Sequence, residues 1–119
     1  MICALLSGTA AASASTGWQA EPMPKPPGAG STVAGSVSCP AKGSCAAVGT
    51  VWAGLGSKAA LVAEHWDGTN WGVQATPAPL QAKQEGLNGV SCLASLSCTA
   101  VGDYNPGNGD AIPYAEQEH

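Results

Sequence analysis

Arginine and phenylalanine are absent from this sequence of 119 residues, and only 10% of its residues are charged. Four lysines against eight acidic residues leave a formal net charge of −4. Proteins that bind nucleic acid carry clustered cationic side chains that contact the phosphates. This composition supplies no such cluster, so we expect no nucleic-acid partner.

Long apolar runs are scarce as well. Apolar residues occur mostly in runs of two or three, separated by many of the 16 glycines and 9 prolines. Such punctuation is typical of many short strands joined by turns, and it disfavours long helices. The composition therefore predicts an all-β fold without a membrane span.

Histidine is rare, with only His65 and His119, whereas there are five cysteines. Four of these cysteines form two C-x5-C pairs: Cys39 and Cys45, then Cys92 and Cys98. Zinc sites use C-x2-4-C pairs or interspersed histidines, and neither is found here. A disulfide within each pair fits better than the two alternatives that stay open, free thiols and a metal site. Disulfides indicate an oxidising compartment, so we expect a secreted or cell-surface protein without a cofactor.

The two cysteine pairs belong to an internal repeat. Residues 37–49, V-S-C-P-A-K-G-S-C-A-A-V-G, match residues 90–102, V-S-C-L-A-S-L-S-C-T-A-V-G, at nine of thirteen positions and with a constant offset of 53. A second match at the same offset joins the Trp-containing segments 18–24 and 71–77. A unit that recurs with its own cysteine pair is a structural module that stacks on copies of itself.

Each repeat unit is predicted to form four strands. The cysteine motif predicts a hairpin, with strands at 34–39 and 44–51 in the first copy and at 87–92 and 97–104 in the second. Asp67-Gly68 between apolar flanks is a strong hairpin signal, so the run 58–66 is predicted as a third strand and the segment from Trp71 as a fourth.

The repeat region spans residues 15–119, with units at about 33–76 and 86–119. Residues 15–24 are expected to form a leading Trp strand. The segment 111–119 matches the third strand of the first unit at an offset of 52. The chain is therefore predicted to hold about two four-stranded antiparallel sheets, the second lacking its last strand.

Residues 1–14 resemble the end of a secretory signal peptide. A run of small and apolar residues ends in Ala12-Ser13-Ala14, which is the A-x-A pattern of a cleavage site, although no Lys or Arg precedes it. On this interpretation Cys3 is removed and the four paired cysteines remain. The alternative is an ordinary N-terminal segment.

These motifs resemble secreted, actinobacterial-type repeat proteins whose units read V-S-C-x5-C-x-A-V-G, A-E-x-W-D-G-T-x-W and T-P-x-P. The matching segments are 87–92, 98–102, 63–71 and 75–79, and the resemblance covers residues 15–119. It implies that each unit is a β-propeller blade and that the chain is a partial propeller. Because closed rings have four to eight blades, it also implies a fragment, a truncated copy, or self-association that completes a propeller.

A more distant resemblance is to the Asp-box propellers of sialidase-like and photosystem-assembly proteins, through Asp67-Gly68-Thr69-Asn70-Trp71. Sialidases bind the carboxylate of their substrate with an arginine cluster, because the guanidinium group is bidentate. This chain has no arginine. Sialidase activity is therefore excluded.

Aromatic and oxygen-bearing side chains are the remaining candidates for binding. Trp52 and Tyr104 are predicted as aromatics on the ligand face of the blades, where they would stack on sugar rings or anchor a protein. Trp18 and Trp71 recur with the repeat and are predicted to pack between blades. A weak calcium candidate consists of Asp103, Asn105, Asn108 and Asp110, for which a plain turn is the favoured alternative.

No nucleophile signature accompanies the polar residues. His65 is expected to be solvated or to support a turn. Glu64 and Glu116 occupy matching repeat positions and could pair as acid and base, but recurrence favours a structural role. We therefore expect no enzymatic activity and a binding module for a glycan or protein. The alternatives are a non-catalytic fragment of a larger secreted hydrolase and a truncated remnant without independent function.

Overall fold

The computed structural model describes residues 17–52, 59–77 and 82–118, and these residues form strands, turns and extended segments without a helix. The predicted all-β class is confirmed. The expected signal peptide at 1–14, including Cys3, lies outside the described residues.

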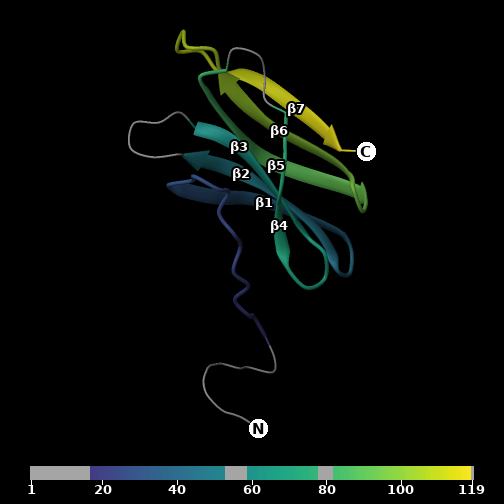
Figure 1. Ribbon diagram of the computed structural model, residues 1–119. Helices are drawn as coiled ribbons and strands as arrows, with labels where there is room; N and C mark the ends of the chain where they lie inside the picture. Colours follow the sequence, from purple (N-terminus) through teal and green to yellow (C-terminus); the bar gives the residue numbers. More distant parts are fainter. Residues whose placement is uncertain (1–16, 53–58, 78–81, 119) are drawn as a thin grey trace.

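Within the described ranges, seven strands form two antiparallel sheets (Figure 1). Sheet A has four strands in chain order, and sheet B has three, also in chain order. The strands of sheet A are β1 (Ser31–Ala41), β2 (Ser44–Trp52), β3 (Ala59–Trp66) and β4 (Trp71–Gln74). Those of sheet B are β5 (Gln84–Ala94), β6 (Ser97–Asn105) and β7 (Ile112–Glu118).

Each cysteine motif folds as the predicted hairpin and contains the predicted disulfide. Cys39 is bonded to Cys45, and Cys92 to Cys98, with Cα atoms 4.0 Å apart in both pairs. Cys92 and Cys98 face each other directly in the β5–β6 register. The bridges therefore hold the two strands of each hairpin in register close to its turn.

A glycine ends each cysteine motif because the chain bulges opposite it. β1 shifts register between Ala34 and Ser36, and β5 shifts between Leu87 and Gly89. At both places the partner strand carries a glycine. A Cβ atom on Gly49 would overlap the carbonyl oxygen of Val33, and one on Gly102 would overlap that of Gly86. The recurring glycine thus allows close approach of two backbones at a β-bulge.

The two sheets pack face to face. Val48 and Leu61 of sheet A and Leu87 and Ala100 of sheet B form the buried cluster between them, and Leu87 is only 2% exposed. Polar contacts join the sheets at their edges. The backbone N–H of Cys92 donates to Oγ of Ser38 at 3.0 Å. Successive residues of a strand point to opposite faces, so each sheet also has a second face that points away from the other sheet.

Residues 17–26 are in no strand, although a leading strand was predicted at 15–24. Trp18 is 100% exposed, so the prediction that it packs between blades is wrong for the described chain. A strand needs a neighbour to accept its backbone hydrogen bonds, and none of the described strands pairs with this segment.

Trp71, the repeat counterpart of Trp18, packs within its own sheet. It lies opposite Trp66 in the β3–β4 register, and the two ring centroids are 5.7 Å apart. The intervening turn is the predicted Asp67-Gly68 hairpin. Oδ1 of Asp67 accepts hydrogen bonds from the N–H groups of Asn70 and Thr69, which lower the pKa of its carboxyl.

Candidate functional site

Trp52 and Tyr104, the two predicted ligand-face aromatics, lie at the same end of the two-sheet stack. Trp52 ends β2 and pairs with Ala59 of β3. The N–H of Ala59 donates to Oε1 of Gln84 at 2.7 Å, and Gln84 pairs with Asn105, the neighbour of Tyr104. Both aromatic residues are half-buried. Both residues therefore lie at the same end of the two sheets, and their role on a ligand face stays a prediction.

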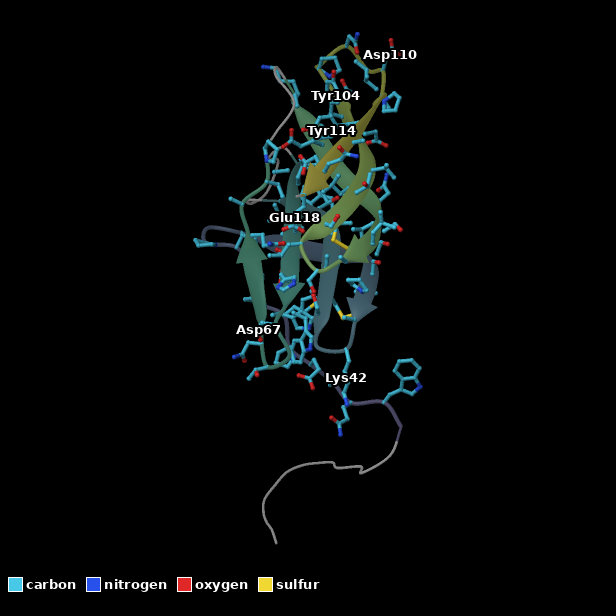
Figure 2. The ribbon with its side chains drawn as sticks, turned by 90° about the vertical axis from the view of Figure 1, so that its right-hand side faces the viewer. Lys42, Asp67, Tyr104, Asp110, Tyr114 and Glu118 are labelled. Atoms are coloured by element: carbon cyan, nitrogen blue, oxygen red, sulfur yellow. A yellow bond between two sulfur atoms is a disulfide. The ribbon has the colours of Figure 1, made fainter. Side chains whose placement is uncertain are left out.

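Tyr114 of β7 is a third aromatic residue at this end, and it packs edge-on against Tyr104 with ring centroids 5.9 Å apart. Figure 2 shows both tyrosines at the end of the molecule opposite Lys42 and Asp67. We call Trp52, Tyr104 and Tyr114 the aromatic end. Burial, followed by the carboxylate of Glu116, raises the pKa of the Tyr114 hydroxyl, so this hydroxyl stays protonated and can donate a hydrogen bond.

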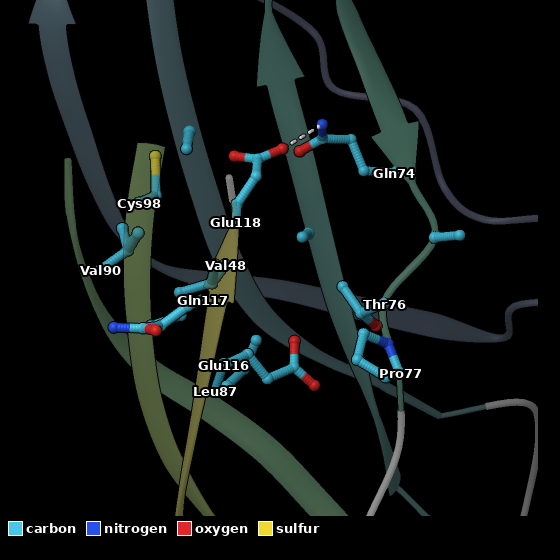
Figure 3. A pocket seen from close by; sticks show the side chains of 14 residues that line it. Val48, Gln74, Thr76, Pro77, Leu87, Val90, Cys98, Glu116, Gln117 and Glu118 are labelled. Carbon is cyan, nitrogen blue, oxygen red and sulfur yellow. Dashed lines mark hydrogen bonds between the residues drawn. The ribbon is translucent and has the colours of Figure 1, made fainter. Parts of the chain in front are cut away.

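A cleft of about 160 Å³ lies between the sheets beside β7 (Figure 3). Its apolar wall includes Val48 and Leu87, and its polar edge carries Glu116 and Glu118. Nε2 of Gln74 donates to Oε2 of Glu118 at 2.9 Å across its mouth. Ligand pockets usually measure at least about 300 Å³, so this cleft is too small for a sugar or a drug-sized molecule.

Glu64 and Glu116 are not brought together as an acid and base pair. Glu116 lines the cleft between the sheets, whereas Glu64 follows Ala63, which lines the same cleft, and therefore lies on the other face of sheet A. Each has one carboxylate oxygen that is buried without a hydrogen-bond partner among the described residues. Burial raises the pKa of both carboxyls.

His65 contacts a serine, which the sequence did not indicate. Its Nε2 lies 3.3 Å from Oγ of Ser44, and the hydroxyl of Ser95 donates to the same Oγ at 2.7 Å. Nucleophilic serine chemistry also needs a group that orients the other ring nitrogen. The nearby Asp67 accepts turn hydrogen bonds instead, as described above. The trio of Ser95, Ser44 and His65 therefore links the two sheets near the hairpin turns, which is a structural role.

The weak calcium candidate forms a hydrogen-bonded turn between β6 and β7. Oδ1 of Asn105 accepts from the N–H groups of Gly107 and Gly109, at 2.7 and 3.4 Å, and Oδ1 of Asn108 accepts from that of Asp110, at 3.0 Å. Asp103 lies on β6 opposite Pro113, before the turn. Two of the four candidate oxygens thus already bind backbone groups, which favours the turn interpretation.

Sequence reasoning missed Tyr114 and the cleft. The repeat counterpart of Tyr114 is Val62, so recurrence gave no signal for an aromatic ring there. The register of β6 and β7 places Tyr114 diagonally across from Tyr104, and this register depends on the length of the intervening loop.

Comparisons with protein-family profiles, with curated proteins and with solved structures give no match for this chain. No helix able to cross a membrane occurs among the residues that the structure describes. Two disulfides are compatible with an extracellular protein.

Proposed function

We propose that this chain is a secreted or cell-surface repeat segment of the β-propeller type that acts as a non-catalytic binding module. The observation that carries the proposal is the aromatic end, where the Tyr104–Tyr114 pair of sheet B and Trp52 of sheet A lie at the same end of the two sheets beside polar groups. We further propose that its ligand is a carbohydrate, because half-exposed aromatic rings stack on sugar faces while neighbouring amides and carboxylates accept or donate hydrogen bonds.

The polar groups beside the rings suit such a ligand. Glu85 faces Tyr104 across the β5–β6 register, and Gln84 and Asn105 are paired next to it. Two lysines also lie at this end: the N–H of Lys83 donates to the carbonyl oxygen of Asn105 at 2.7 Å, and Nζ of Lys25 donates to that of Gly30 at 3.3 Å. Because charges of both signs are present, the ligand we favour is a neutral polysaccharide, with a protein partner as the other outcome of the test.

The propeller-type architecture is supported by the repeat and by the order of the strands. Both sheets are antiparallel with strands in chain order, and the chain passes directly from the last strand of sheet A to the first of sheet B. Propeller blades are built and connected in this way. Secretion is supported by the two disulfides and by the sequence of residues 1–14.

Titration with a panel of neutral polysaccharides, followed by tryptophan fluorescence, tests the ligand proposal. We expect at least one polysaccharide to quench or shift the emission of the wild-type protein, because its sugar rings would contact Trp52. The response should be lost in Trp52→Phe and kept in Trp18→Phe, which removes a fully exposed indole far from the site.

A wild-type protein that gives no response to any polysaccharide contradicts the carbohydrate proposal. A response that disappears in Trp18→Phe but persists in Trp52→Phe places the contact elsewhere and contradicts the role of the aromatic end.

A further inference from the structure

We infer that the chain associates head to tail with further copies of itself, by repeating between molecules the packing that joins sheet A to sheet B. In this arrangement the outer face of sheet B of one copy stacks on the outer face of sheet A of the next. The segment 18–21 of that next copy then adds to β7 of the first copy as the fourth strand of its sheet B. The inference does not depend on the carbohydrate ligand.

The outer face of sheet A repeats the surface with which sheet B contacts sheet A. Sheet B contributes Val90, Ala100 and Glu116 to the contact between the sheets. The counterparts of these residues one repeat earlier are Val37, Ala47 and Glu64, which are identical in type. These three are neighbours across β1, β2 and β3, with Val37 paired to Ala47 and Ala47 to Glu64. They lie on the face of sheet A that points away from sheet B, where Val37 is 56% exposed but Ala47 and Glu64 are each 4% exposed, so a second copy would have to displace what covers these two.

The outer face of sheet B repeats the surface that sheet A offers in return. Val48 and Ala63 of sheet A line the contact between the sheets. Their counterparts in sheet B are Val101 and Ala115, again identical in type and paired with each other across β6 and β7. Val101 is 50% exposed, and Ala115 is exposed as well.

A polar contact of the sheet-to-sheet packing is also available to a second copy. Within one chain the N–H of Cys92 donates to Ser38. The counterparts are Cys39 as donor and Ser91 as acceptor, and Ser91 is exposed on β5. The two outer faces are therefore complementary to each other and not to themselves. Such a contact is heterologous, so it extends from copy to copy until a ring closes or a filament forms.

The segment 18–21 is the repeat counterpart of β4, the fourth strand of sheet A, whereas the described part of sheet B has three strands. In sheet A, β3 pairs with β4 on its outer edge, and β4 leads through residues 75–83 to β5 of the next sheet. The counterpart of β4 is 18–21, which leads through residues 22–30, a connection of equal length, to β1. The counterpart of β3 is β7, which pairs only with β6 among the described strands. The repeat register places Trp18 opposite Glu118, as Trp71 lies opposite Trp66.

The N-terminal segment lies on the side of the molecule where this exchange would occur. Met23 borders a hollow with Val37, Ala47 and Trp71 on the outer face of sheet A. Figure 1 shows the segment that precedes β1 leaving on the side of sheet A away from sheet B. A second copy that docks its sheet B on this face would displace the N-terminal segment of the first copy. The displaced segment would then pair with β7 of the second copy.

The contact between copies is weaker than the contact within the chain. Ala34 is the counterpart of Leu87, so the largest buried side chain of the sheet-to-sheet packing is missing between copies. We therefore expect an association that depends on protein concentration.

Light scattering after size-exclusion chromatography of the full chain tests this inference. We expect the measured mass to rise above the 11.7 kDa of one chain as concentration increases. Val37→Glu and Val101→Glu should each remain monomeric, since each disrupts one of the two faces at a half-exposed position. Mixing these two variants should restore a one-to-one dimer, because each brings the intact face that the other lacks. Lys42→Gln, which makes the same change in charge in an exposed hairpin turn, should associate like the wild type.

A wild-type chain that stays monomeric up to about 1 mM overturns the inference. So does association of either valine variant alone at wild-type strength, or failure of their mixture to form the dimer while circular dichroism shows both folded. Trp18→Ala should weaken the association at least tenfold, and an unchanged dissociation constant would exclude the added strand. Polysaccharide binding by a monomeric chain would leave the proposed function standing without this inference.

Discussion

Replacing Gly102 with alanine should lower the free energy of unfolding by about 3 kcal/mol or more, because the added methyl group meets backbone atoms that cannot rotate away. Its Cβ would overlap the carbonyl oxygen of Gly86 and approach Cα of Leu87 to 2.8 Å. Relief requires the β-bulge in β5 to move, and Leu87 in the buried cluster would move with it. Gly49→Ala should cost a similar amount, since Gly49 faces Val33 in the same way. Urea denaturation followed by circular dichroism measures both.

Gly72→Ala is the matched control for this prediction. Gly72 lies in β4, and a Cβ atom there would meet nothing within 4 Å. Alanine should be neutral or stabilise the protein by up to about 1 kcal/mol, because it restricts the unfolded chain. If Gly102→Ala unfolds at the same urea concentration as Gly72→Ala, the close approach at the bulge does not exist.

Leu87→Ala should lower the free energy of unfolding by about 3 kcal/mol, within the range found for leucine truncation in protein cores. Leu87 is the largest fully buried side chain among the described residues, and it packs with Val48, Leu61 and Ala100 between the two sheets. Few large apolar side chains are buried here, so the loss removes a substantial part of the contact between the sheets. The urea midpoint, measured by circular dichroism, reports the loss.

Leu93→Ala provides the comparison, because Leu93 lies on the same strand and is 93% exposed. Its effect should remain within about 0.5 kcal/mol. Equal effects of the two substitutions would mean that Leu87 is not buried between the sheets.

Much of the secondary structure could be predicted from the sequence, because a strand or turn assigned in one repeat unit is supported by matching residues in the other. The cysteine hairpins and their disulfides rest on local signals that recur at an offset of 53, and the Asp67-Gly68 turn rests on a local signal that occurs once. The apolar run that forms β3 also suits a helix. The Asp67-Gly68 turn signal after it favoured a strand, and the structure confirms the strand.

Residues 17–24 of the predicted leading strand form no strand in the described structure, for a physical reason. Trp18 and Trp71 occupy matching repeat positions, but among the described residues only Trp71 has a neighbouring strand with which to pair. The local sequence of a segment does not show whether another strand will lie beside it to pair with. The same limit applies to the candidate site. The sequence placed Trp52 and Tyr104 at one end from strand order, whereas Tyr114 joins them through a register that no local signal fixes.

The repeat also explains which residues are conserved between the two units. Gly49 and Gly102 recur because each lies against a bulge, so recurrence reports packing at the glycines. At the matching valines it does not, since Val90 packs between the sheets whereas Val37 is 56% exposed on the outer face of sheet A. Recurrence is uninformative about a ligand, and the aromatic end is built from residues whose counterparts differ: Val51, Val62 and Asn105.

The most direct test of the face-to-face packing is a disulfide engineered between the sheets, with Thr50→Cys and Gly86→Cys in one protein. A Cβ atom at position 86 would lie 3.6 Å from Cβ of Thr50, which is within the range for a disulfide. We expect non-reducing peptide mapping to find positions 50 and 86 bonded within one chain, with the Cys39–Cys45 and Cys92–Cys98 bridges retained. Two thiols that stay free under mild oxidation, or that bond only between chains, would contradict the stacking of β5 on β2.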